Sequence, residues 1–87
     1  MRIAVLIDLP PTARYHRATL DALGHAAASL GVEIDDLDVR HTDAARVRDL
    51  DGVDGVVIGP GSPYRDEPAV WEVVQTARQR GVPLVGT

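Results

Sequence analysis

The fold of this chain is decided by the stretch VVIGPGSPY, residues 56–64, in which a short apolar run ends in a loop of glycine, proline and serine. Its three leading β-branched residues follow an Asp54-Gly55 turn signal without polar alternation, which predicts a strand buried on both faces, as in parallel sheets. Gly61 carries no side chain, so the backbone N–H groups there can approach a ligand closely. We therefore expect function in the loop after this strand.

A strand and then a helix are predicted at the start of the chain. IAVLI, residues 3–7, is uniformly apolar and ends at Asp8, which is typical of a central parallel strand. From about Ala13 the apolar residues recur at three- and four-residue steps, which predicts an amphipathic helix that closes at Gly31. The stripe consists of Leu20, Leu23, Ala27 and Leu30.

The middle of the chain predicts a second strand and a short helix. Apolar residues alternate over residues 32–39, with a slip at residues 35–36 that is typical of a bulge or an edge strand. Thr42 or Asp43 can then cap a short helix over Ala44–Leu50. The alternating residues of the strand are Val32, Ile34, Leu37 and Val39.

A last helix and strand follow residues 56–64. Pro68 suits the first turn of a helix that begins near Glu67, and Gly81 ends that helix. Leu84 and Val85 then begin a fourth strand. The predicted buried side of the helix is Val70, Val73, Val74 and Ala77.

Strands that alternate with helices predict an α/β domain over residues 1–87, with a flavodoxin- or Rossmann-like, three-layer parallel sheet in the order 2-1-3-4. The first helix is expected on one face and the others on the opposite face. Ligands bind such sheets beyond the carboxyl ends of the strands, where the winding direction reverses. The loops expected there are residues 8–12, residues 59–66 and whatever follows Thr87. Candidate pocket-lining residues are Asp8, Pro63, Tyr64, Gly86 and Thr87.

Composition excludes several classes of function. The net charge of -4 and the lack of any basic cluster give no electrostatic case for nucleic acid or an anionic membrane. The chain has no cysteine, which excludes disulfides, a thiolate metal site and a cysteine nucleophile within these residues. No apolar run is long enough to span a membrane. We expect a cytoplasmic protein without a metal or a cofactor.

Two stretches carry a resemblance to a known family. GPGSPY at residues 59–64 and GVPLVGT at residues 81–87, together with the opening strand RIAVLIDL, resemble the first half of a class I glutamine amidotransferase domain. The nearest likeness within that family is to the glutaminase domain of CTP synthase and its small stand-alone relatives. The resemblance covers the whole chain. It implies that the first stretch is the oxyanion loop and that the second leads into a nucleophile elbow of the form Gly-x-Cys-x-Gly.

The resemblance also implies the roles of individual residues. The backbone N–H groups of Gly61 and Ser62 correspond to the oxyanion donors, and Gly86 and Thr87 are the first two positions of the elbow. The nucleophile is expected immediately after Thr87, and the family's histidine and glutamate further downstream. Glutamine is the substrate that the complete domain implies. The 87 residues alone are expected to be inactive, because hydrolysis of an amide needs that nucleophile.

Simpler interpretations stand beside these. Gly61-Ser62 is also typical of a tight turn between a strand and a helix, and Asp8 of a residue that caps the following turn. The three histidines, His16, His25 and His41, are expected at the surface, and Trp71 is expected to serve packing.

Two function classes therefore remain open. One is the amino-terminal part of a glutaminase domain, whose relatives include proteins with selenocysteine, encoded by UGA, at the nucleophile. The other is a non-catalytic, flavodoxin-like module that binds a small ligand or acts by assembly. Leu84 and Val85 are expected to form an open edge strand, which favours self-association.

Overall fold

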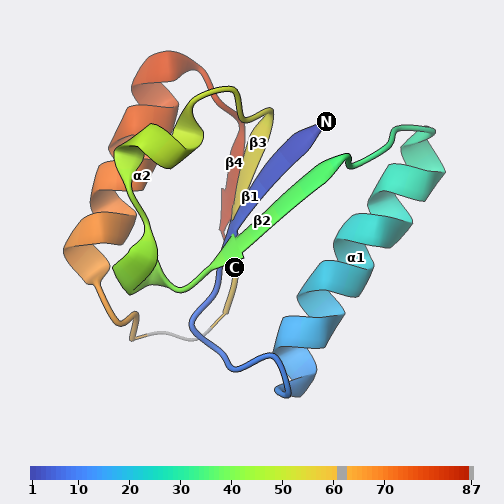
Figure 1. Cartoon of the computed structure of the whole chain (residues 1–87), viewed down its shortest axis with the longest axis horizontal. Helices are drawn as coiled ribbons and strands as arrows, with labels where there is room; N and C mark the ends of the chain where they lie inside the picture. Colours follow the sequence, from blue (N-terminus) through green and yellow to red (C-terminus); the bar gives the residue numbers. More distant parts are fainter. Residues whose placement is uncertain (61–62, 87) are drawn as a thin grey trace.

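The computed structural model describes residues 1–60 and 63–86, and its centre is a sheet of four parallel strands in the order β2-β1-β3-β4 (Figure 1). This is the predicted order. The register places Arg2 opposite Asp36, Ile3 opposite Gly55 and Val56 opposite Leu84. The strands are β1 (Arg2–Leu6), β2 (Asp36–Arg40), β3 (Gly55–Ile58) and β4 (Leu84–Gly86).

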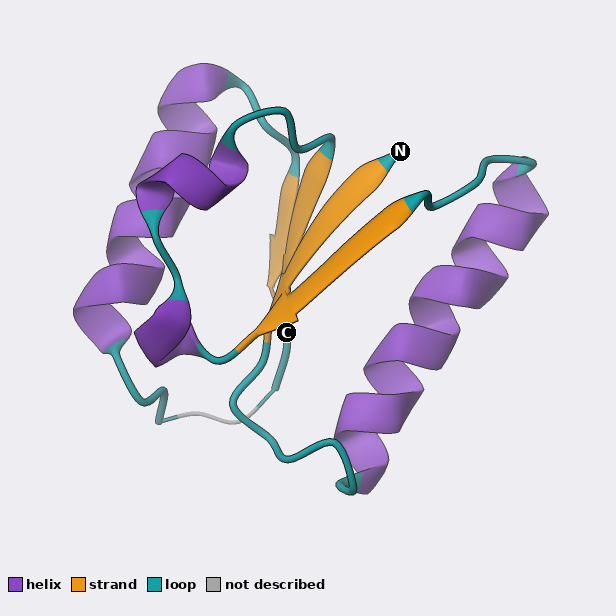
Figure 2. Ribbon diagram, viewed as in Figure 1, coloured by secondary structure: helices purple, strands orange, loops and turns teal. Residues whose placement is uncertain are grey.

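Helices cover the two faces of the sheet, which gives the predicted three layers (Figure 2). The helix α1 (Arg14–Leu30) lies on one face, and α2 (Glu67–Arg80) lies on the other with two short 3-10 helices. Both long helices end as predicted, at Gly31 and Gly81, whose φ angles of 70° and 71° lie in the left-handed region that favours glycine.

The best-packed part of the core lies between the sheet and α2. The predicted buried side of α2 is confirmed, except that Val74 is only half-buried. The face toward α1 is packed less closely. A groove of about 460 Å³ separates α1 from the sheet, and Leu30, predicted to belong to the apolar stripe, is 77% exposed. The core residues on the α2 side are Ala4, Leu6, Ala45, Leu50, Val56, Ile58, Val70, Val73 and Ala77.

The second strand is shorter than predicted. β2 begins at Asp36, so Val32 and Ile34 belong to the connection that precedes it and not to the strand. The register explains this difference. Asp36 pairs with Arg2, and the N–H of Asp35 donates to the carbonyl oxygen of Met1 at 2.9 Å, so residues 32–34 lie beyond the paired part of β1.

The prediction of a short helix over Ala44–Leu50 was wrong. The chain instead forms two 3-10 helices, η1 (Thr42–Ala44) and η2 (Val47–Leu50), separated by extended backbone at Ala45 and Arg46. Ala45 and Leu50 are both buried in the core, whereas a single helix that starts at Ala44 would not have to bury both of them. The N–H of Arg46 donates to Asp49 Oδ2 at 2.7 Å, which favours a new turn at that point.

Candidate functional site

The loops that follow β1 and β3, together with the end of β4, lie at one edge of the sheet, the lower edge in Figure 2. This edge, called the carboxyl edge below, holds the carboxyl ends of the strands, where ligands bind in open parallel sheets. Three of the residues predicted for the site, Gly61, Ser62 and Thr87, lie outside the described residues.

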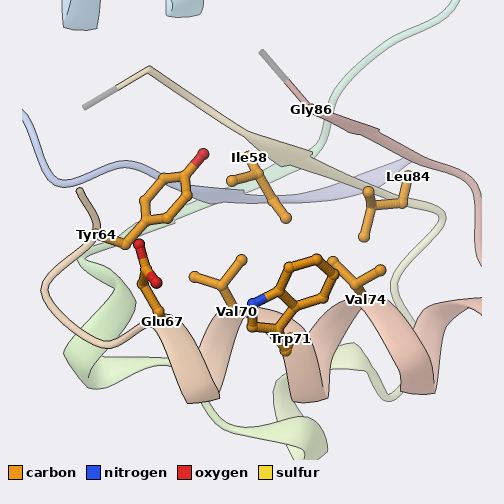
Figure 3. A pocket seen from close by; sticks show the side chains of 8 residues that line it. All are labelled: Ile58, Tyr64, Glu67, Val70, Trp71, Val74, Leu84 and Gly86. Atoms are coloured by element: carbon orange, nitrogen blue, oxygen red, sulfur yellow. The ribbon is translucent and has the colours of Figure 1, made fainter. Parts of the chain in front are cut away.

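A pocket of about 450 Å³ lies between α2 and the end of β4 (Figure 3). Tyr64, from the loop after β3, and Gly86, from β4, both line it, so the structure brings these two predicted residues together. Asp8 and Pro63 are not among the residues that line this pocket. The remaining lining residues are Ile58, Glu67, Val70, Trp71, Val74 and Leu84.

The walls of this pocket are mainly apolar. Its polar side-chain groups come from Tyr64, Glu67 and the indole N–H of Trp71. Tyr64 and Glu67 lie together at the end nearer the β3 loop, whereas the opposite end is formed by aliphatic side chains (Figure 3). Trp71 also lines the pocket and is 65% exposed, so the expectation that it serves packing was wrong. The pocket thus offers a hydrophobic wall beside a short polar end.

Asp8 joins three segments that are distant in the sequence. Its carboxylate accepts hydrogen bonds from the N–H and the hydroxyl of Thr42 and from the N–H of Arg65, each at 2.7 Å. The Asp8 side chain is only 6% exposed. The interpretation of Asp8 as a residue that caps nearby backbone is thus close to the observed role, but its partners lie in η1 and in the β3–α2 loop.

A chain of hydrogen bonds continues from Asp8 to the start of α2. The Thr42 hydroxyl donates to Asp8 and accepts from the N–H of Asp66 at 3.1 Å. Asp66 in turn accepts from the N–H of Ala69 at 3.0 Å and caps α2. This chain fixes the carboxyl edge of the sheet relative to the helix that forms one wall of the pocket. Sequence analysis missed the role of Thr42 because the contact depends on long-range pairing.

The environment of Asp8 lowers the pKa of its carboxyl group. Burial by itself raises that pKa, because it disfavours the charged form, but the hydrogen bonds from Thr42 and Arg65 together outweigh it. The group is therefore held as a carboxylate whose oxygens are directed at protein donors. This arrangement suits a structural link better than a proton-transfer group.

Two histidines lie close to this network. His16 is 7% exposed, so the expectation that it lies at the surface was wrong; it lines a small cavity of about 120 Å³ with His41, Ile7 and Val39. The Nδ1 atom of His41 is buried and has no hydrogen-bond partner among the described residues. It lies 3.8 Å from Asp8 Oδ1, which is too long for a hydrogen bond. His25 is exposed, as expected.

Metal-binding side chains do not converge in the part of the chain that the structure describes, where no group of three His, Cys, Asp or Glu residues is placed to hold an ion. Over the same residues, none of the helices is both long and apolar enough to cross a membrane. No protein-family model matches the sequence, and no curated protein is significantly similar to it.

Proposed function

We propose that this chain forms the amino-terminal half of a glutamine-hydrolysing domain of the class I glutamine amidotransferase type, which releases ammonia from glutamine. The observation that carries the proposal is that Tyr64 and Gly86 line one pocket at the carboxyl edge of the sheet. Each residue belongs to one of the two stretches, GPGSPY and GVPLVGT, on which the resemblance rests.

In this proposal the chain supplies the groups that stabilise charge. A thiolate attacks the side-chain carbonyl of glutamine, ammonia leaves, and water then hydrolyses the acyl-enzyme to glutamate. The N–H groups of Gly61 and Ser62 are assigned to the oxyanion that forms in each step. The nucleophile and its proton-transfer partner come from residues other than these 87, which contain no cysteine.

The network centred on Asp8 supports this assignment. The N–H of Arg65 donates to Asp8, in the loop that follows β1, and the N–H of Asp66 donates to Thr42 in η1, so the loop after β3 is attached to both. Oxyanion donors act best when they are held in place before the charge develops. The attachment of this loop at Arg65 and Asp66 supports the proposal on that ground.

A second candidate function is a non-catalytic binding or assembly module. The mainly apolar pocket wall favours it, because the hydrolysis of an amide needs polar groups around the substrate.

The test is a hybrid protein in which residues 1–87 are joined to the carboxyl-terminal half of a CTP synthase glutaminase domain, which supplies the missing catalytic residues. We expect ammonia release from glutamine. The variant Ser62→Pro, which removes one N–H, should lower kcat by roughly 10²–10³. Ser62→Ala keeps the N–H and serves as the matched control. A folded hybrid without turnover, or equal activity of the two variants, would contradict the proposal.

A further inference from the structure

β4 is an edge strand, and no described residue pairs with its outer side. The carbonyl oxygen of Pro83 accepts from the N–H of Val56 at 2.9 Å on the inner side. Because alternate residues of a strand direct their N–H and C=O groups to opposite sides, those of Leu84 and Gly86 point away from β3. The outer side of β4 therefore presents backbone groups ready for pairing.

The two outer strands of the sheet, β2 and β4, differ in how well they are protected against pairing with another chain. The opposite edge strand, β2, has charged side chains at three of its five positions, and such charges discourage pairing with another chain. β4 has none, since its sequence is Leu-Val-Gly. Large apolar side chains of β4 and of the neighbouring helix α2 are also exposed, with Val85 at 61% and Trp71 at 65%. Only the β4 edge therefore combines open backbone with an apolar surround.

A self-complementary stripe on α2 faces this edge. Glu67, Trp71 and Val74 line the pocket beside β4, and Arg78 follows them on the same side of the helix because their spacing is i, i+4, i+7 and i+11. The stripe has an acid at one end, a base at the other and apolar residues between them. Neither Glu67 nor Arg78 forms an ion pair within the described residues.

We propose that a second copy of this chain occupies the β4 edge, with the two β4 strands antiparallel about a twofold axis at Val85. The result is a dimer with a continuous eight-stranded sheet. The chain itself identifies this occupant, because the outward backbone groups of Leu84 and Gly86 and the charges at the two ends of the stripe are complementary to those of a copy turned about a twofold axis. An interface of this kind is isologous, with the same patch contributed by both copies.

The backbone fits this arrangement. An axis at Val85 makes that residue a non-hydrogen-bonded pair with Val85 of the second copy, the closer kind of antiparallel pair. Leu84 then lies opposite Gly86 of the second copy, and the pair exchanges two hydrogen bonds. The symmetric pair exchanges two more, so the outward groups of both residues gain partners.

The helices fit the same axis. Reversal of the stripe places Glu67 opposite Arg78 of the second copy and Trp71 opposite Val74 of the second copy. The midpoint of the stripe lies between Trp71 and Val74, which line the same pocket as Leu84 and Gly86, the two neighbours of Val85 in the strand. One twofold axis therefore pairs the strands, covers the exposed indole and matches the charges.

This inference concerns the 87-residue chain and does not rest on the proposed function. It is tested by sedimentation equilibrium of that chain over a range of concentrations. We expect a reversible dimer. Val85→Lys should abolish it, because two ammonium groups meet at the axis, whereas Leu37→Lys on β2, at a residue already 39% exposed, should leave it unchanged. Circular dichroism reports whether each variant is folded.

A charge exchange distinguishes this interface from non-specific association. Glu67→Arg alone and Arg78→Glu alone each create two like-charge contacts and should weaken the dimer about tenfold, and the double variant should restore it. A monomer at all concentrations, association that persists in folded Val85→Lys, or no restoration in the double variant would overturn the proposal. Slow amide exchange over Leu84–Gly86 in a monomer would also overturn it, because another segment would then cover β4.

Discussion

Replacement of Asp8 by asparagine tests whether the carboxyl edge of the sheet is held together by one carboxylate. Asp8→Asn preserves the shape of the side chain but removes its charge and turns an NH₂ group toward donors. Three hydrogen bonds from Thr42 and Arg65 converge on this buried carboxylate. Hydrogen bonds to charged groups contribute about 1.5–3 kcal/mol each, and since they are not additive we expect a loss of roughly 3 kcal/mol.

That loss is a large part of the total free energy of unfolding. A domain of this size has a free energy of unfolding of about 4–13 kcal/mol, so the melting temperature of the variant should be more than about 10 °C below that of the wild type. Urea unfolding followed by circular dichroism at pH 7 measures the difference in free energy of unfolding. Asp21→Asn, at an exposed position on α1, is the matched control and should change it little.

The stabilisation by the Asp8 carboxylate should depend on pH in a definite direction. The folded-state pKa of Asp8 is lowered below its value of 3.8, so the stabilisation is present above that pH and is lost as the pH falls through the folded-state pKa. The difference between wild type and Asp8→Asn should therefore shrink in strong acid. A difference below about 1 kcal/mol at pH 7, or one that grows in acid, would refute the reasoning.

Two further predictions concern single positions, and a third concerns the activity of the chain. Gly59→Ala should destabilise the protein by about 1–3 kcal/mol in urea unfolding, because a Cβ there lies 2.8 Å from Ile7 Cδ1; its control, Gly24→Ala, has open space within α1 and should stabilise it by roughly 0.5–1 kcal/mol. A destabilising Gly24→Ala would count against the description of α1. Asp66→Ala should cost about 1 kcal/mol by loss of the α2 cap, and an unchanged unfolding midpoint would show that the cap is not formed in solution. Ammonia release from glutamine by the 87-residue chain should stay at the level of buffer, and activity above it in protein free of contaminating amidotransferase would refute the assigned division of roles.

The strands and their order were predictable because local signals agreed with the global fold. The apolar run of residues 3–7 and the glycines at the helix ends each specify their element without help from distant residues. The start of β2 was not predictable, since its alternating pattern continues upstream of the point where β1 can pair with it. Register is a property of two strands, and the sequence of one strand does not contain it.

The meeting of Tyr64 and Gly86 was predictable from the sequence, but the contacts around Asp8 were not. Tyr64 follows β3 and Gly86 ends β4, and the topology brings the ends of these neighbouring strands to one edge, so their meeting follows from the strand order. The bonds of Asp8 join residues separated by 34 and 57 positions, and the burial of His16 depends on how α1 crosses the end of the sheet. Such contacts are decided by packing and leave no periodic signal in the sequence.

The most direct measurement for the central claim, that this chain is half of a glutaminase domain, is the nucleotide sequence that follows the codon of Thr87. The account predicts that the next codon specifies cysteine, or is UGA read as selenocysteine, and that glycine stands two positions later. In-frame codons for a histidine and a glutamate should lie further downstream. A different residue at position 88 and no such downstream codons would contradict the account and favour the non-catalytic module.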